Sequence, residues 1–308
     1  MNIKNMLEFA AFRVLVGGSR LLPFRALRAF LMRFFAFIYR IGLLRPRIVE
    51  TNLSIALGGT ATPGQVRKAA RKCVAEHGRM AAELIHEERF MNHPGESFRV
   101  SGIEHLQDAA SRGRGVLILS AHYGNIVLAG YRIAQMGYPL AYVSRPVRNP
   151  AVRVELERFY TKYGNTIIPI RSSRNDASGG LKIFKHLRRG GILVVINDQD
   201  AGAEGYRSTF FGVPSFIPSG PAHFAFRSGA AVLTAFAGRH GDKVDIDIQA
   251  PIDFSNAKDI TEAESLILDE YTRRLEAKVA ESPELYFWFH KKWKSSPGFR
   301  ARYKGETP

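Results

Sequence analysis

The chain has 308 residues, of which 45% are hydrophobic and 23% are charged, and its formal net charge is +16. A chain of this size and composition can bury a core of its own, which excludes a collagen, a disordered chain and a polytopic membrane protein. Cys73 is the only cysteine, so a disulfide framework and a cysteine-based zinc cluster are excluded as well.

The positive charge is concentrated at the two ends of the chain. Residues 1–48 hold nine basic residues and one acid, and residues 285–304 hold six basic residues and no acid. Residues 49–284 carry a formal charge of only +3. An evenly basic nucleic-acid protein would not show this distribution, so we expect no nucleic-acid partner. The basic ends instead indicate contact with an anionic membrane surface.

The N-terminal segment, residues 1–48, is rich in aromatic and aliphatic side chains as well as in arginine. Its charge-free runs reach only six residues, far short of the roughly 20 that a membrane-spanning helix needs. Pro23 is expected to divide the segment into two helices. A helical wheel of the second helix places apolar residues opposite four arginines: Arg25, Arg28, Arg33 and Arg40. This pattern predicts anchor helices that lie in a membrane interface; the alternatives are packing on the protein's own domain and one strongly tilted span.

A capping box is expected at residues 62–65, Thr-Pro-Gly-Gln, at the start of a long helix. The threonine can cap the helix, the proline suits its first turn and the glutamine completes the box. Apolar residues spaced three and four apart follow over residues 66–84 and predict one buried face. Cys73 and His77 lie on that face, so we interpret both as packing residues.

Beyond residue 102, short apolar runs alternate with helical patterns. The expected strands are residues 115–120, 140–143, 166–170, 191–196, 231–235 and 244–248. The expected helices are approximately residues 125–136, 150–163, 178–189, 219–228 and 261–281. Several of the strands lack a polar face, as in a parallel sheet that helices cover on both sides. The sequence therefore predicts an α/β fold: a single domain over residues 49–308 with a mixed, mostly parallel sheet, preceded by amphipathic membrane-anchor helices over residues 1–48.

Two polar segments directly follow expected strands, where sites of open α/β sheets gather. Residues 120–125, Ser-Ala-His-Tyr-Gly-Asn, place His122 before a helix whose first N–H groups could hold an oxyanion. Residues 197–202, Asn-Asp-Gln-Asp-Ala-Gly, place Asp198 and Asp200 at another strand end. These carboxylates could orient the histidine, bind a cation or simply cap a turn, and the alternatives stay open at this point.

Five blocks of the sequence resemble, in order, those of the bacterial lipid A late acyltransferases, which belong to the lysophospholipid acyltransferase superfamily. Residues 119–125, around His122, look like the catalytic block of that family. The others are residues 47–53, 145–150, 198–202 with 210–212, and 283–294. The resemblance implies a lysophospholipid acyltransferase-like fold, and basic, apolar N-terminal anchors are usual in the family.

The resemblance implies an enzyme of lipid A or glycolipid biosynthesis that moves a fatty acyl group from an acyl carrier protein or coenzyme A thioester to a glycolipid hydroxyl. By that analogy His122 is the general base and Asp198 is a catalytic carboxylate. The candidate substrate-binding residues are Asn125, whose N–H with that of Gly124 would hold the oxyanion, Arg145 and Arg148 as anion contacts, and Asp200. We expect no metal and no cofactor besides the thioester, because metal-site and nucleotide motifs are absent from the sequence. The implied location is the cytoplasmic side of the cell inner membrane, either peripheral or with a single N-terminal anchor.

One position departs from the family pattern. The family carries Asp or Glu five residues after the histidine, where it orients the imidazole and stabilises the imidazolium; this chain has Val127. Three explanations are open: Asp198 or Asp200 reaches His122 in space, or the enzyme is an amine-directed acyl or aminoacyl transferase of the same fold, or the chain is a non-catalytic glycolipid- or membrane-binding relative. A carboxylate within hydrogen-bond reach of His122 would argue against the last of these.

The basic C-terminal block combines aromatic rings with lysines: Tyr286, Trp288, Trp293, Lys291, Lys292 and Lys294. This composition suits rings at the level of lipid headgroups and cations that meet lipid phosphates. The other interpretation is a set of core aromatics followed by a solvated charged tail, and both can hold at once, because alternate residues of a strand face opposite ways.

Overall fold

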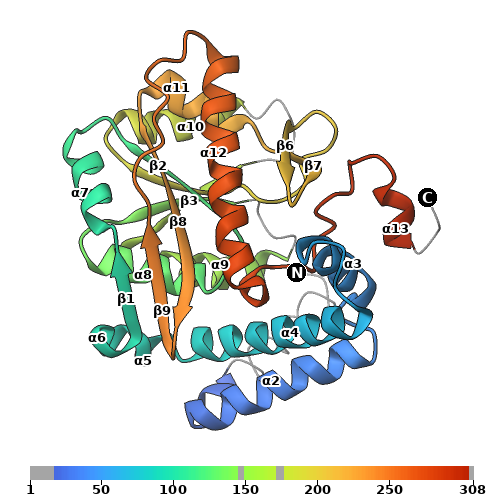
Figure 1. Ribbon diagram of the computed structural model, residues 1–308. Coiled ribbons are helices and arrows are strands. Elements are labelled where there is room, and N and C mark those ends of the chain that lie inside the picture. Colours follow the sequence, from blue (N-terminus) through green and yellow to red (C-terminus); the bar gives the residue numbers. More distant parts are fainter. Residues whose placement is uncertain (1–16, 145–148, 171–176, 305–308) are drawn as a thin grey trace.

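The described residues form a seven-stranded sheet through the centre of the molecule (Figure 1). The computed structural model describes residues 17–144, 149–170 and 177–304. The strand order is β1-β9-β8-β2-β5-β3-β4, and neighbouring strands are parallel except β8 with β9. The strands are β1 (Phe98–Ser101), β2 (Val116–Ser120), β3 (Leu140–Ser144), β4 (Thr166–Pro169), β5 (Ile192–Ile196), β8 (Ala231–His240) and β9 (Lys243–Ile248). The prediction of a single α/β domain with a mixed, mostly parallel sheet is confirmed.

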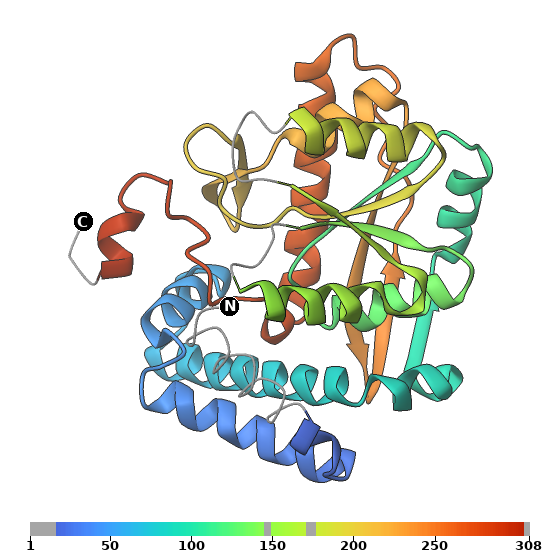
Figure 2. The same cartoon turned by 180° about the vertical axis from the view of Figure 1, so that it is seen from behind.

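Helices cover both faces of the sheet. They are α2 (Phe24–Arg40), α3 (Pro46–Ala56), α4 (Pro63–Ile85), α5 (Glu87–Asn92), α6 (Pro94–Ser97), α7 (Ile103–Ser111), α8 (Ile126–Gln135), α9 (Pro150–Thr161), α10 (Ala177–Arg188), α11 (Gly220–Ser228), α12 (Ile260–Glu281) and α13 (Phe299–Lys304), with short 3₁₀ turns at Lys162–Gly164 and Pro283–Leu285. Alternate residues of β2 enter different cores: Leu117 and Leu119 share one with α10, α11 and α12, and Val116 and Ile118 share the other with α7 and α8. Helix α12 crosses one face in Figure 1, and the green helices α8 and α9 lie in front in Figure 2.

The strands and helices expected beyond residue 102 all have counterparts in the structure, with ends displaced by a few residues. Strand β8 is longer than expected, because it continues to His240. The sequence did not predict β1, α7 or the hairpin of β6 (Tyr206–Phe210) and β7 (Val213–Ile217). The hairpin turns at Phe211 and Gly212, whose φ angles are 51° and 71°. A two-residue turn of this kind normally carries Asn or Gly at both positions. Because Phe211 stands at the first position, the turn has no clear signal in the sequence.

The long helix α4 begins as the sequence predicts. The Thr62 Oγ1 accepts a hydrogen bond from the Gln65 N–H (3.3 Å), and the Gln65 Oε1 accepts one from the Thr62 N–H (2.7 Å). Cys73 is fully buried, and the His77 ring packs edge-on against Phe289 with ring centroids 5.0 Å apart. The capping box and the packing role of both residues are therefore confirmed.

Pro23 separates a helical stretch at residues 17–20 from α2, as predicted for this part of the segment. Residues 1–16 of the predicted anchor lie outside the described residues. Helix α2 packs along α4, with Leu27 and Tyr39 buried against the domain (Figures 1 and 2). Four apolar side chains on its outer side, the apolar row, stay about half exposed: Phe30 (56%), Phe34 (44%), Phe37 (57%) and Ile41 (54%).

Helix α2 thus packs on the protein's own domain, which was one alternative. It still presents apolar side chains to the outside, as an interfacial helix would. In residues 17–144, 149–170 and 177–304, no helix combines the length and the apolar character that crossing a membrane requires. The membrane anchor stays a prediction.

Candidate active site

The loop between β2 and α8 carries His122, and its backbone is held from two sides. Gly124 has a φ of 63°, and a Cβ there would lie 1.6 Å from the Ala237 carbonyl oxygen, so only glycine lets the loop approach β8 this closely. On the other side the Gly124 N–H donates to the Leu285 carbonyl (2.9 Å), and the Phe287 N–H donates to the His122 carbonyl (2.9 Å). Strand β8 and the C-terminal segment therefore fix the position of His122.

His122 and Asp198 meet because β2 and β5 are neighbours in the sheet. The parallel register pairs Ser120 with Ile196, so the residues two positions beyond these strand ends lie side by side. The His122 Nδ1–H donates to Asp198 Oδ1 over 2.8 Å. Asp198 is 2% exposed, whereas the His122 side chain is 36% exposed. Of the three explanations that the sequence left open for Val127, the structure supports the first, and Asp198 is the acid that reaches His122.

Burial and charge act in opposite directions on this pair. Burial lowers the pKa of His122, but the charge and the hydrogen bond of Asp198 outweigh it and raise the pKa above its ordinary value. Burial likewise raises the pKa of Asp198, but the charge and hydrogen bond of His122, helped by Lys292 and Tyr286, bring the pKa below its ordinary value. Asp198 is therefore a carboxylate at neutral pH, and it leaves the His122 Nε2 available to exchange a proton.

Asp200 and Val127 make other contacts. The Asp200 Oδ1 accepts hydrogen bonds from the Gly202 N–H (2.9 Å) and the Ser295 hydroxyl (2.7 Å), and Oδ2 accepts one from the Ser295 N–H (2.9 Å). These bonds cap a turn and hold the C-terminal segment, so of the two acids only Asp198 bonds to His122 in the described part of the chain. Val127 packs in the core that α7 and α8 cover. A role of Asp200 in substrate binding stays a prediction.

The structure describes only some of the other predicted substrate contacts. Asn125 is buried; its Oδ1 accepts from the Leu128 N–H (3.4 Å) and caps α8, while Nδ2 donates to Glu83 Oε2 (3.0 Å). The Gly124 N–H is not free for an oxyanion, because it bonds to the Leu285 carbonyl. A contact between Asn125 and substrate stays a prediction. So do the anion contacts of Arg145 and Arg148, which lie outside the described residues.

Glu83, on α4, contacts the His122 loop through Asn125 and was not predicted as a site residue. It is buried, and its carboxylate accepts from Arg79 Nε (3.1 Å) and Arg239 Nη1 (2.8 Å) as well as from Asn125. Two guanidinium groups compensate its charge, so the carboxylate can hold the cap of α8 in a buried position. A carboxylate three residues beyond Met80, on the buried face of α4, was the available signal.

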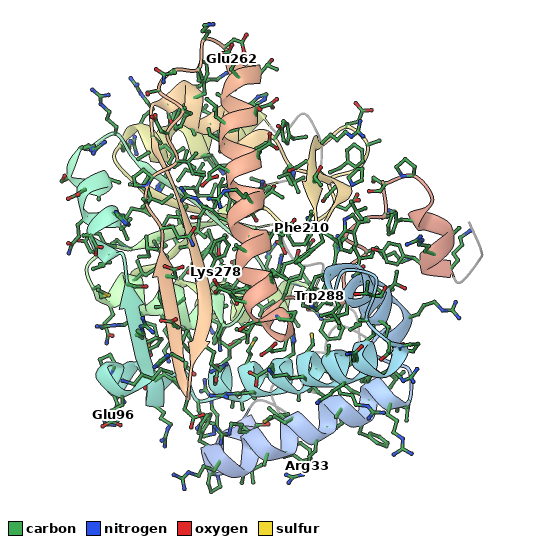
Figure 3. All side chains as sticks on the ribbon, in the orientation of Figure 1. Arg33, Glu96, Phe210, Glu262, Lys278 and Trp288 are labelled. Atoms are coloured by element: carbon green, nitrogen blue, oxygen red, sulfur yellow. The ribbon has the colours of Figure 1, made fainter. Side chains whose placement is uncertain are left out.

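The predicted headgroup position of the C-terminal rings is wrong, and the alternative of core aromatics is confirmed. Tyr286, Trp288 and Trp293 are buried, and Figure 3 shows Trp288 inside the molecule while Arg33 points away from it on α2. The segment can enter the core because Asn52 Nδ2 donates to the carbonyls of Trp288 (2.8 Å) and His290 (2.7 Å). Lys292 is buried with the rings, so the charged tail is not fully solvated as that alternative supposed.

An open pocket of about 490 Å³ lies next to the His122 loop. Phe287 lines the pocket and connects it to the loop, since its ring centroid lies 5.7 Å from that of His122 and 5.8 Å from that of His77. The pocket has apolar and polar walls: Phe35, Leu43, Leu44, Phe287, Phe289, Arg45, His77, Gln199 and His290. Burial lowers the pKa of both His77 and His290, so these imidazoles are neutral at neutral pH. Among the residues that the structure describes, no three His, Cys, Asp or Glu side chains are placed to hold a metal ion.

The sequence matches the family model of the bacterial lipid A biosynthesis acyltransferases over residues 6–295. Among curated proteins, a phosphatidylinositol mannoside acyltransferase of Mycolicibacterium smegmatis is 23% identical over 74% of this chain. A lipid A biosynthesis palmitoleoyltransferase and a lipid A biosynthesis lauroyltransferase of Escherichia coli are 25% and 28% identical over 65% and 66% of it. These alignments cover 68%, 62% and 64% of the three relatives' own lengths.

Proposed function

Because the chain belongs to the family of bacterial lipid A biosynthesis acyltransferases, we propose that it transfers a fatty acyl group from a thioester to a hydroxyl of a membrane glycolipid. The observation that carries this proposal is the 2.8 Å hydrogen bond between His122 and Asp198. It supplies the carboxylate that Val127 cannot, and it weighs against a non-catalytic relative. The relatives' names mention two glycolipids, so a glycolipid is the acceptor class that we propose.

In the proposed reaction His122 is the general base and Asp198 is its orienting carboxylate. The His122 Nε2 takes the proton from the acceptor hydroxyl as its oxygen attacks the thioester carbonyl carbon. The C–S bond then breaks, and the departing thiolate takes the proton from the imidazolium, which leaves an ester and a free thiol. Asp198 holds Nδ1–H throughout and stabilises the imidazolium. A positioned base of this kind contributes about 10²- to 10⁴-fold to the rate.

The pocket beside Phe287 suits an amphipathic acceptor. Phe35, Leu43 and Leu44 offer an apolar wall for lipid chains, and Arg45 with Gln199 offers donors for phosphate or sugar oxygens. The donor thioester would be carried by acyl carrier protein or coenzyme A. Arg145 and Arg148 would contact its phosphate or that of the acceptor, and Asn125 and Asp200 would keep the surrounding loops in place.

The proposed location is the cytoplasmic side of the inner membrane, with the protein bound peripherally through its N-terminal segment. The exposed apolar row of α2 supports this, because rings at the outside of an arginine-rich helix are typical of interfacial helices. A membrane position would also let an acceptor lipid reach the pocket, since Leu43 and Leu44 follow α2 directly and line its wall.

Substituting His122→Ala tests the proposed function. We expect loss of at least about 10²-fold in acyl transfer, measured by mass spectrometry of the lipid acceptor, because the variant lacks the imidazole that Asp198 orients. His223→Ala is the matched control: His223 also contacts a carboxylate, Glu264 (2.5 Å), but it lies on α11 away from the pocket, and we expect unchanged transfer. Full activity of folded His122→Ala would exclude this mechanism, and an amide product stable to mild alkali would identify an amine acceptor instead.

A further inference from the structure

Lys292 is a buried cation behind the His122–Asp198 pair. It is 3% exposed, and its Nζ donates to the Asp198 backbone carbonyl over 2.6 Å. The ammonium also lies 4.8 Å from the centroid of the Phe210 ring. The hydrogen bond of the ammonium goes to a neutral carbonyl. In the described part of the chain, Lys292 forms no ion pair closer than 4 Å. A buried ammonium is costly without an anion nearby, and the charges of the Asp198 and Asp200 carboxylates act to raise its pKa.

The proposed reaction creates a need for this cation. His122 can accept a proton only when its imidazole is neutral. In that state Asp198 loses the cationic partner that His122 provides when protonated, although its carboxylate is still buried. A buried carboxylate without a counter-ion takes up a proton or retains the one it shares with its neighbour. Of the groups that favour the Asp198 carboxylate, Lys292 is the one that remains positively charged when His122 is neutral, and Tyr286 adds a hydrogen bond.

We infer that Lys292 is a positioning residue that serves as the counter-ion of Asp198 and keeps it ionised while His122 is neutral. This rests on the proposed function of the pair as base and orienting acid. Lys292 acts through Asp198 and touches no reacting atom. The role assigned to it is electrostatic, and it is distinct from the hydrogen bond that its ammonium makes to the backbone.

The charge state of the surroundings agrees with this role. Burial lowers the pKa of Lys292, and the charges of Asp198 and Asp200 partly oppose this, so that the pKa is about 8. Most of the Lys292 side chain is therefore charged at neutral pH. Burial lowers the pKa of His290 and outweighs the charge of Asp198, which raises it, so that ring adds no charge. Burial raises the pKa of Tyr286 well above its ordinary value, so its hydroxyl stays neutral too.

The inference is tested by NMR titration of the His122 imidazole in the full-length protein, with His122→Ala used to assign the resonance. Lys292→Gln removes the charge and keeps a donor for the Asp198 carbonyl, and Lys292→Arg keeps the charge. A nearby cation disfavours protonation, so its loss should raise the midpoint of the His122–Asp198 pair by about one pH unit in Lys292→Gln. Lys292→Arg, which keeps the charge, should have a midpoint close to that of the wild type. A folded Lys292→Gln protein with the wild-type midpoint would overturn the inference.

A reciprocal measurement keeps the inference testable if Lys292→Gln does not fold. Coupling between two sites is mutual, so Asp198→Asn should lower the midpoint of Lys292, followed through its side-chain ¹³Cε resonance. An unchanged Lys292 midpoint would overturn the counter-ion role. Neither titration needs a substrate, which separates this inference from the proposed function. Shifted midpoints in a protein that transfers no acyl group would support the counter-ion and contradict the proposed reaction.

Discussion

Asp198 sets the pH at which His122 can accept a proton. With its carboxylate in place the pKa of His122 lies above the ordinary 6.5, so kcat/KM should fall as the pH drops through a midpoint above that value. In Asp198→Asn the carboxylate that favours protonation is gone while burial still lowers the pKa of the imidazole, so the midpoint should move below that of the wild type, opposite in sign to the effect of Lys292→Gln. We also expect kcat to fall by about 10²- to 10⁴-fold. The measurement is the pH profile of acyl transfer by wild-type and variant protein.

The matched control for Asp198→Asn is Asp253→Asn. Asp253 is a fully exposed aspartate whose carboxylate bonds to the Ser255 N–H (2.9 Å), so its loss should leave the profile unchanged. An Asp198→Asn protein with the wild-type midpoint would contradict the pairing of Asp198 with His122 in solution.

Both members of the pair could be predicted as site candidates, because each directly follows an apolar strand. Their contact could not, because His122 and Asp198 are 76 residues apart and meet only through the order and register of β2 and β5. From the residues alone the choice between Asp198 and Asp200 stayed open, and only the family resemblance pointed to Asp198. That choice depends on the turn at Gly202 and on Ser295, which belongs to a distant segment.

The packing of α2 on α4 depends on one glycine. A Cβ on Gly78 would lie 2.6 Å from the Leu31 carbonyl oxygen and 2.9 Å from Met32 Cα, and these are backbone atoms that cannot rotate away. Gly78→Ala should therefore push α2 off the domain and lower the free energy of unfolding by about 1–3 kcal/mol. Thermal unfolding measures the loss, and hydrogen exchange of α2 measures the displacement.

Gly64 offers the matched control on the same helix. A Cβ there would meet only Thr62 Oγ1, at 3.8 Å, so Gly64→Ala should be neutral or stabilising by up to about 1 kcal/mol. Equal stability of the two variants would show that α2 and α4 are not held at this distance in solution.

Elements with a clear local signal were predicted, and those that depend on distant contacts were not. The capping box of α4 and the apolar strands are local patterns. The segment around Trp288 has the composition of an interfacial belt, yet it lies in the core because Asn52, far away in the chain, satisfies its carbonyls. Aromatic and basic composition alone does not separate these two locations.

In the part of the chain that the structure describes, most of the exposed large apolar side chains belong to α2 and the residues next to it. Of the ten large apolar residues that are exposed in the described part of the chain, seven lie between residues 21 and 43. The arginines of the N-terminal segment accompany them, so the excess charge and the exposed apolar surface coincide. A soluble surface would scatter such residues singly, whereas a cluster of this kind indicates a binding face.

Replacing the apolar row tests whether this face binds lipid. In the triple variant Phe30→Ser, Phe34→Ser, Phe37→Ser we expect at least about tenfold weaker binding to vesicles of phosphatidylethanolamine and phosphatidylglycerol, because each ring buried in the interface contributes roughly 1 kcal/mol or more. The matched control replaces three apolar side chains of similar exposure on other helices, with Val154→Ser, Leu181→Ser and Leu266→Ser, and should bind as the wild type does. Cosedimentation measures both proteins.

The contribution of the arginines is separable from that of the rings. Attraction to phosphatidylglycerol is screened by salt, whereas apolar insertion is not, so salt should weaken the wild type and the ring variant by a similar factor, and the loss caused by the ring substitutions should persist at every salt concentration. If the triple variant bound as tightly as the control at every salt concentration, α2 would not be the docking face. Retained acyl transfer to a detergent-dispersed acceptor, with transfer to the vesicle-bound acceptor lost, would show that the row delivers the enzyme to the membrane and leaves the His122–Asp198 pair intact.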